Sequence, residues 1–157
     1  MLTTIEKTLL LRQIDFFGEC SEEALVELAA HMQEMEAAAG ETFLEKGAMG
    51  SSLYLVVAGE IRLHDGVQTV ANRGEGQVLE ELALLDPSPR AVAATAISDT
   101  QLLRLDREPF LDVLQDHDEL AQGMLQLLAQ RLRRVSPGRS DSFLDDVLGG
   151  LADSFAA

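Results

Sequence analysis

Between positions 40 and 76, glycine interrupts the chain so often that a stable helix has no room to form. The glycines stand at positions 40, 47, 50, 59, 66, 74 and 76. The intervals between them have the usual length of β-strands. Four of them predict strands, at residues 42–44, 53–57, 60–64 and 67–71. The dipeptide Asp65-Gly66 favours a tight hairpin between the last two.

Two further strands complete the predicted β region. Residues 91–97 and 101–105 predict strands that a short polar turn separates. Six short strands with regular turns between them are typical of a barrel or a jelly roll. We therefore expect a β jelly roll, also called a double-stranded β-helix.

Helical periodicity flanks this β region on both sides. Apolar residues recur at helical spacing over residues 2–11, and Ser21 is the expected N-cap of a second helix that runs to about Met35. Asp106 is the expected N-cap of a third helix, and a longer helix follows from about Glu119. The predicted fold class is mainly β, with helices at both ends of the domain.

The sequence divides into one domain and a short tail. Residues 1–135 carry the predicted strands and helices. Residues 136–157 combine a linker rich in serine, proline and glycine with an amphipathic helical pattern. Two interpretations of this tail stay open: it packs back on the domain, or it docks a protein partner or a second copy of the chain.

Charge and composition narrow the range of partners. The chain has 27 acidic and 12 basic residues, and a surface this acidic repels a phosphate backbone, so no nucleic acid is expected. The longest apolar run, residues 53–58, is far shorter than the roughly 20 residues that cross a bilayer, so no membrane span is expected. Cys20 is the single cysteine, which excludes an internal disulfide and indicates a cytoplasmic protein.

No residue pattern indicates catalysis or a resident cofactor. The histidines at positions 31, 64 and 117 have no metal-ligand spacing to one another or to Cys20, so no metal site is predicted. Ser51 and Ser52 have no nucleophile-elbow sequence around them. We therefore expect a protein that is not an enzyme and that has no cofactor.

One segment departs from the pattern of packed strands and turns. A single helical turn at residues 81–85 is followed by a turn between Pro87 and Pro89, and then by Arg90 at the start of a strand. Free backbone N–H groups at the start of a helical turn, with a bidentate arginine opposite them, can hold an anion. The alternative is a surface turn with a solvated arginine.

The residues of this segment resemble the phosphate-binding cassette of cyclic nucleotide-binding domains. The resemblance rests on Glu81-Leu82-Ala83-Leu84-Leu85 followed by Arg90-Ala91. It extends to Phe16-Phe17, Gly40-Glu41-Thr42 and Val57-Ala58-Gly59-Glu60-Ile61. It covers residues 2–134 and implies a jelly roll whose C-terminal helices act as a lid over a bound cyclic nucleotide, cAMP or cGMP.

The resemblance implies a role for each residue of the cassette. Arg90 would pair with the exocyclic phosphate oxygens, and Glu81 would accept a hydrogen bond from the ribose 2′-hydroxyl. The N–H groups expected near the phosphate or the sugar belong to Leu82, Ala83 and Ala91. The residue that would cap the base lies in the region of Leu127, Leu128 and Leu132.

Two positions depart from the family pattern and make the cassette degenerate. Relatives usually have glycine where Glu80 stands and alanine where Val92 stands. If position 80 needs a positive φ, a β-carbon there costs about 1–2 kcal/mol. A Glu80 carboxylate ~5 Å from the phosphate would also repel it by about 3 kcal/mol at an effective dielectric constant of about 20. Alternatively, Glu80 faces solvent, or it turns inward and pairs with Arg90 in place of the ligand phosphate.

Two functions therefore stay open. The first is a non-enzymatic sensor that binds a cyclic nucleotide and signals through its C-terminal helices. The second is a domain with lost or weak nucleotide binding that acts as a protein-interaction or scaffold module, through its acidic surface and its tail. An open pocket with an unpaired Arg90 would favour the sensor, and Arg90 buried against Glu80 or Glu81 would favour the scaffold.

Overall fold

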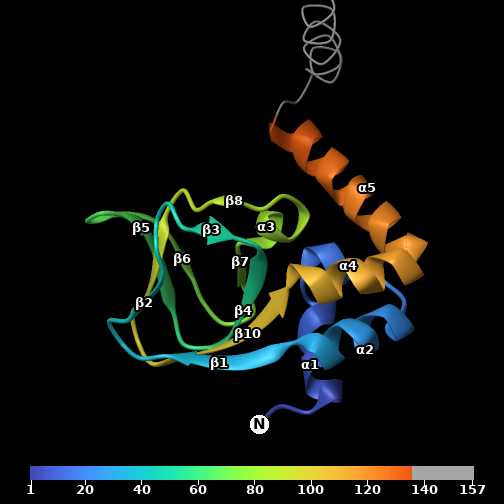
Figure 1. Ribbon diagram of the computed structural model, residues 1–157, viewed down its shortest axis with the longest axis horizontal. Coiled ribbons are helices and arrows are strands. Elements are labelled where there is room, and N and C mark those ends of the chain that lie inside the picture. The colour runs from blue at the N-terminus through green and yellow to red at the C-terminus, as the bar shows by residue number, and fades with distance from the viewer. Residues whose placement is uncertain (136–157) are drawn as a thin grey trace, which may run out of the picture.

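The computed structural model describes residues 1–135 as a β roll with a group of helices at one end (Figure 1). One four-stranded sheet contains β1 (Gln33–Ala37), β10 (Thr100–Asp106), β4 (Ser52–Ala58) and β7 (Val78–Leu79), in that order. The second contains, in order, β2 (Thr42–Leu44), β9 (Ala93–Ala96), β5 (Ile61–Asp65) and β6 (Gln68–Arg73). A small third sheet pairs β3 (Met49–Gly50) with β8 (Ser88–Pro89).

Every strand pair in the three sheets is antiparallel. Neighbours within a sheet are mostly distant in sequence: β1 pairs with β10, and β2 pairs with β9. Such long crossovers between two facing antiparallel sheets define a jelly roll. The predicted fold class is confirmed.

The helices occur on both sides of the strands in sequence but gather at one end of the roll in space (Figure 1). The chain begins with α1 (Thr4–Arg12), a short 3-10 helix η1 (Asp15–Phe17) and α2 (Glu22–His31), and it closes with α4 (Arg107–Asp116) and α5 (Asp118–Val135). A one-turn helix, α3 (Glu81–Leu85), lies between β7 and β8. Ser21 caps α2 as predicted, since its side chain accepts a hydrogen bond from the N–H of Ala24.

Strand β4 is buried on both faces and joins the two parts of the hydrophobic core. Leu53 and Leu55 point into a cluster shared with the helices, which includes Phe17 and Phe110. Tyr54 and Val56 point into a second cluster between the two four-stranded sheets, with Ile61 and Leu102. Successive side chains of a strand face opposite sides, so one continuous apolar run supplies both clusters. Leu84 is fully buried in the first cluster and anchors α3 against this strand.

Two details of the predicted elements were wrong. The second helix ends at His31 rather than near Met35, because Met32 is extended, with ψ 134°, and Gln33–Ala37 pairs with β10 as strand β1. Pairing with a distant strand overrides the helix propensity of this Glu- and Met-containing stretch. Asp106 occupies the N-cap position of α4 but makes no capping bond; its carboxylate accepts from Ser52 at 2.7 Å and pairs with Arg104 at 3.0 Å.

The predicted linker and amphipathic tail, residues 136–157, lie outside the described residues. Among residues 1–135, none of the helices is both long enough and apolar enough to cross a membrane.

Candidate functional site

The predicted cassette folds around a pocket of about 270 Å³ on the side of the roll. It is lined by Glu80, Glu81, Leu82, Ala83, Ser88, Pro89, Arg90 and Ala91. Every predicted cassette residue therefore lines this pocket except Val92, whose half-buried side chain does not line it. The one-turn helix α3 and the strand β8 bring these residues together from both sides of the proline-containing turn.

Arg90 is held by backbone contacts with the segment that leads into β3. Its N–H donates to the carbonyl oxygen of Ala48 at 2.9 Å, and its own carbonyl oxygen accepts from the N–H of Gly47 at 2.8 Å. The side chain is only 11% exposed and runs under Gly50. A β-carbon at position 50 would lie 3.3 Å from Nε of Arg90 and 3.4 Å from its Cγ. Glycine at position 50 thus permits the close approach of the arginine side chain.

Glu80 has φ 65° and ψ 26° and is the one residue other than glycine with a positive φ in the described part of the chain. Glycine adopts this left-handed conformation freely, whereas holding glutamate in it costs about 1–2 kcal/mol. The carboxylate turns inward: its Oε2 lies 3.8 Å from Nε of Arg90, and its side chain is 20% exposed. Of the three orientations considered from the sequence, Glu80 adopts the one that faces Arg90.

The contact between Glu80 and Arg90 is an ion pair without a hydrogen bond. The buried Nε–H of Arg90 has no hydrogen-bond acceptor among the described residues. Burial raises the pKa of the Glu80 carboxyl, the charge of Arg90 lowers it, and the neighbouring Glu81 raises it further, with a net upward shift. The ionised form of Glu80 is therefore an unfavourable occupant of the pocket, and Arg90 only partly offsets its loss of hydration.

Glu81 connects the pocket to the C-terminal helix. Its carboxylate lies 3.7 Å from Nη1 of Arg131 on α5. Arg131 also lies 3.6 Å from the carboxylate of Asp15, and its guanidinium carbon stands 4.9 Å from the centre of the Phe16 ring. One arginine thus links α3, η1 and α5. Arg131 was not identified from the sequence, because its partners on η1 and α3 are far from it in the chain and no local pattern marks the contact.

The backbone N–H groups predicted to lie near the ligand differ in whether they already have an acceptor within the protein. The N–H of Ala83 already donates to the carbonyl oxygen of Glu80 at 3.0 Å, inside the turn that opens α3. Leu82 is 58% exposed, so its side chain stands at the surface beside the pocket. None of the three leucines considered for the lid lines the pocket: Leu127 and Leu128 pack against the core beneath the helices, and Leu132 is 50% exposed.

An antiparallel jelly roll with terminal helices, a one-turn helix and a buried arginine after it defines a class of ligand-binding regulatory domains. The model of the cyclic nucleotide-binding domain family matches residues 34–117, more than half of the chain. The chain belongs to the cyclic nucleotide-binding domain family.

Individual relatives agree with this assignment. The chain is 27% identical to a CRP-like cAMP-activated global transcriptional regulator of Mycobacterium tuberculosis, over 91% of this chain and 66% of that protein. It is 38% identical to a cyclic AMP receptor protein of Thermus thermophilus, over 76% of this chain and 57% of that protein. The chain thus matches under two thirds of the length of either relative.

Among solved structures, the N-terminal domain of a transcriptional regulator from Streptomyces coelicolor A3(2) superposes with a TM-score of 0.76 at 31% identity. The match covers 82% of this chain and 94% of that one. The similarity therefore extends over nearly the whole of that N-terminal domain.

Proposed function

We propose that this chain is a non-enzymatic regulatory module in which Arg90 binds the phosphate of a cyclic nucleotide that displaces Glu80. The observation that carries the proposal is the state of the Arg90 side chain, which is 11% exposed, lines the cassette pocket and has an Nε–H without a hydrogen-bond acceptor. Buried donors in folded proteins nearly always have an acceptor. A phosphate accepts from two guanidinium N–H groups at once, in a strong bidentate contact.

The same proposal assigns the other contacts of the ligand. Glu81 accepts from the ribose 2′-hydroxyl, the N–H groups of Leu82 and Ala91 donate to the phosphate or sugar, and Ala83 contributes its small side chain to the pocket wall. Val92 directly precedes β9 and does not line the pocket, so we assign it no contact with the ligand. Two relatives are named for cAMP, so we expect cAMP to bind more tightly than cGMP.

Glu80 makes this a weakened site rather than a closed one. Its carboxylate competes with the phosphate for Arg90, but its raised pKa indicates that burial outweighs the attraction of the arginine. A ligand that brings its own charge and hydrogen bonds can therefore displace it. We expect low affinity compared with a domain that has glycine at this position.

The ion pair between Glu81 and Arg131 is the proposed route from the pocket to α5. A ribose hydroxyl that donates to Glu81 weakens the contact of this carboxylate with Arg131 at 3.7 Å. Both side chains are partly exposed, 27% and 37%, so the pair contributes at most about 1 kcal/mol. A coupling free energy near this size is sufficient to change the ratio between two positions of α5 several-fold.

Calorimetric titration with cAMP and cGMP tests the assignment of Arg90. Arg90→Gln should lower the affinity roughly tenfold to a hundredfold, the size of a charged hydrogen bond to phosphate. Arg104→Gln is the matched control, because Arg104 also pairs with a carboxylate, that of Asp106 at 3.0 Å, but lies outside the pocket. Equal affinities for wild type and Arg90→Gln would overturn the proposal.

A second candidate function is an interaction module that does not use a nucleotide. The ion pair of Arg90 with Glu80 favours it, and so do the apolar residues on the outer face of α5: Leu125, Leu132 and Val135 are 67%, 50% and 81% exposed. This module would bind a protein partner or a second copy of the chain through its C-terminal helices. It predicts that Glu80→Gly also fails to bind either nucleotide. In both versions we place the protein in the cytoplasm, where the buried thiol of Cys20 stays reduced.

A further inference from the structure

A buried histidine, His117, lies between the two C-terminal helices and does not line the cassette pocket. α4 ends at Asp116 and α5 begins at Asp118, so His117 alone joins them. Its side chain is 10% exposed, although those of Asp116 and Asp118 beside it are exposed. The carbonyl oxygen of His117 accepts from the N–H of Leu120 at 3.1 Å, which ties it to the first turn of α5.

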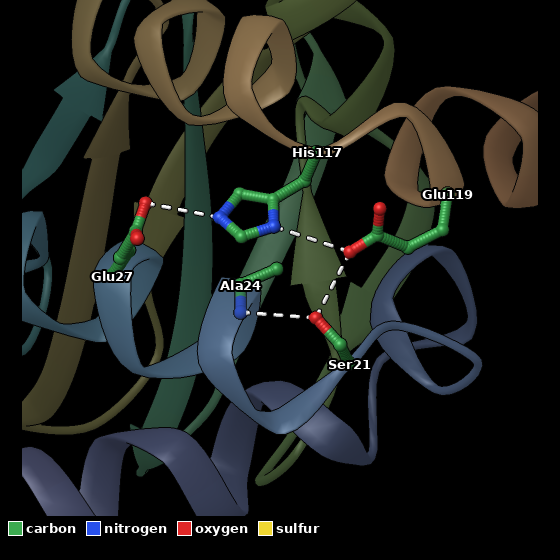
Figure 2. A network of polar contacts seen from close by, with 5 residues as sticks. All are labelled: Ser21, Ala24, Glu27, His117 and Glu119. Carbon is green, nitrogen blue, oxygen red and sulfur yellow. Dashed lines mark hydrogen bonds and ion pairs between the residues drawn. The ribbon is translucent and has the colours of Figure 1, made fainter.

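Both ring nitrogens of His117 face carboxylates from different helices (Figure 2). Nδ1 lies 3.1 Å from Oε1 of Glu119 on α5, and Nε2 lies 3.2 Å from Oε2 of Glu27 on α2. The contact with Glu119 is a hydrogen bond, and the contact with Glu27 is an ion pair. The imidazole therefore connects α2 with the start of α5.

Only one protonation state fits this arrangement. A neutral imidazole has one N–H and one lone pair, so one of the two carboxylates would face a lone pair. The imidazolium has two N–H groups and a positive charge between the two negative ones. The helix ends do not decide the charge, because the C-terminus of α4 favours a cation at His117 and the N-terminus of α5 directly after it opposes one.

The network continues into the N-cap of α2 (Figure 2). The hydroxyl of Ser21 donates to Oε1 of Glu119 at 2.9 Å and accepts from the N–H of Ala24 at 3.2 Å. The same carboxylate oxygen of Glu119 thus accepts from Ser21 and from His117. The joint between α4 and α5 therefore contacts α2 at two points. Glu119 binds Ser21 at the N-cap of α2, and His117 contacts Glu27 in the second half of α2.

The surroundings stabilise the charged form. Burial lowers the pKa of His117, but the contacts with Glu27 and Glu119 outweigh it and raise the pKa above its ordinary value. The backbone and the hydroxyl of Ser21 hold the pKa of Glu119 below its ordinary value. The groups that face the ring are thus carboxylates from α2 and α5, with Asp116 and Asp118 next to it in the chain, and the described residues place no cation against it.

We propose that His117 is a proton-operated latch that fixes the joint between α4 and α5 to α2. With the proton bound, both carboxylates are satisfied and α5 keeps the direction seen here. Loss of the proton removes one N–H and the charge, the contact with Glu27 or Glu119 is released, and α5 gains freedom to swing. The latch is operated by pH and needs no ligand. If α5 transmits nucleotide binding, as proposed above, pH also changes that signal.

The direction of the pH effect follows from the raised pKa. The latch is closed below the ordinary histidine pKa of about 6.5 and opens as pH rises through the higher value in the folded protein. Acidification should therefore order α5, and mildly alkaline conditions should release it. A swing about position 117 moves the far end of α5 most.

Fluorescence energy transfer across the joint measures this swing. Dyes are attached at Ala30→Cys on α2 and Arg133→Cys on α5, both exposed positions. Burial raises the pKa of Cys20 to about 11, so the native thiol stays unreactive during labelling at neutral pH. Between about pH 5.5 and about pH 8.5, transfer efficiency should change in a single step with its midpoint above about 6.5.

Three variants separate the latch from general effects of pH. His117→Gln should remove the step, and Glu27→Gln, which keeps the ring and deletes one carboxylate, should move its midpoint to lower pH. His31→Gln removes an exposed histidine at the end of α2 and should leave the step unchanged. NMR titration of the His117 ring in the wild-type chain provides the midpoint without any substitution.

Two results would overturn the latch: constant transfer efficiency in the wild type across this range, or a step that survives in His117→Gln. No nucleotide is present in the experiment, so its outcome is separate from that of the titrations with cAMP and cGMP. Failure of nucleotide binding would leave the latch in place, and failure of the latch would leave the assignment of Arg90 in place.

Discussion

Replacing Glu80 by glycine should turn a weak nucleotide site into a strong one. The substitution removes the carboxylate that lies 3.8 Å from Nε of Arg90 and places glycine at a backbone position with φ 65°. Two separate terms change at once: the electrostatic competition for Arg90, and the strain of a β-carbon in the left-handed region.

The electrostatic term is the larger of the two. Opposite unit charges 3.8 Å apart attract by about 4 kcal/mol at an effective dielectric constant of about 20. The raised pKa of Glu80 shows that its lost hydration offsets this attraction. An ionised carboxylate that stayed about 5 Å from a bound phosphate would still repel it by about 3 kcal/mol, which corresponds to on the order of a hundredfold in affinity. The backbone term adds about 1 kcal/mol to the stability of the variant, because relief of strain is partly offset by the greater freedom of unfolded glycine.

Comparing Glu80→Gly with Glu80→Gln separates these terms. Glutamine keeps the β-carbon and the size of the side chain but has no charge, so it should show most of the gain in affinity and little gain in stability. Affinity is measured by calorimetry with cAMP, and stability by urea unfolding. If all three proteins bind cAMP with affinities within about threefold of one another, Glu80 does not compete for Arg90 and the reasoning fails.

The raised pKa of Glu80 predicts a pH dependence with a definite sign. Burial, opposed by Arg90 and assisted by Glu81, raises the pKa of this carboxyl above its ordinary value. Its contribution to stability is therefore greatest below the ordinary glutamate pKa and decreases as pH rises through the higher folded value. Wild-type affinity for cAMP should rise on acidification through this range, as Glu80 becomes neutral, whereas Glu80→Gln should lack this rise.

Three further predictions concern stability, each measured by urea or thermal unfolding. Gly50→Ala should destabilise the protein by about 1–3 kcal/mol, because the added β-carbon would lie 2.9 Å from Oε2 of Glu80. Gly123→Ala is the control: a β-carbon there has nothing within 4 Å, so the variant should stabilise α5 by about 0.5–1 kcal/mol. Equal effects of the two substitutions would contradict the tight approach at position 50. Phe110→Ala should cost about 3–5 kcal/mol, because the ring is fully buried in the cluster that joins helices and sheet; a loss under about 1 kcal/mol would show that the cluster is loosely packed. His117→Gln should lower stability relative to wild type below about pH 6.5 and less so as pH rises, since the favourable state is the protonated one; a difference that does not depend on pH would argue against the charged form.

The fold could be predicted largely from local sequence. Glycine spacing located the main strands, because a glycine every few residues leaves strand-length segments, and Asp65-Gly66 marked the hairpin of β5 and β6. The one-turn helix Glu81–Leu85 was also predicted, because proline brackets the turn after it. Strand β1 was missed, since its residues favour a helix and only pairing with β10, far along the chain, makes them extended.

The cassette residues that the sequence groups together also lie together in the structure, but their contacts with other elements were not predicted. The cassette residues are close in sequence, so a motif was enough to group Arg90 with Glu81. The contact of Glu81 with Arg131 joins residues far apart in the chain, and no local pattern marks it. The same holds for His117 and Glu27, which meet only because α2 packs beside the joint of α4 and α5. Such contacts depend on tertiary packing, which residue types in sequence order do not specify.

The most direct test follows the Nε–H resonance of Arg90 by NMR during a titration with cAMP. A phosphate oxygen that accepts from this buried donor should shift the resonance downfield and slow its exchange with water. The same change should appear at lower nucleotide concentration in Glu80→Gly. If cAMP binds, as judged by calorimetry, while the Arg90 resonance stays unchanged, then the guanidinium is not the phosphate ligand and the account is wrong.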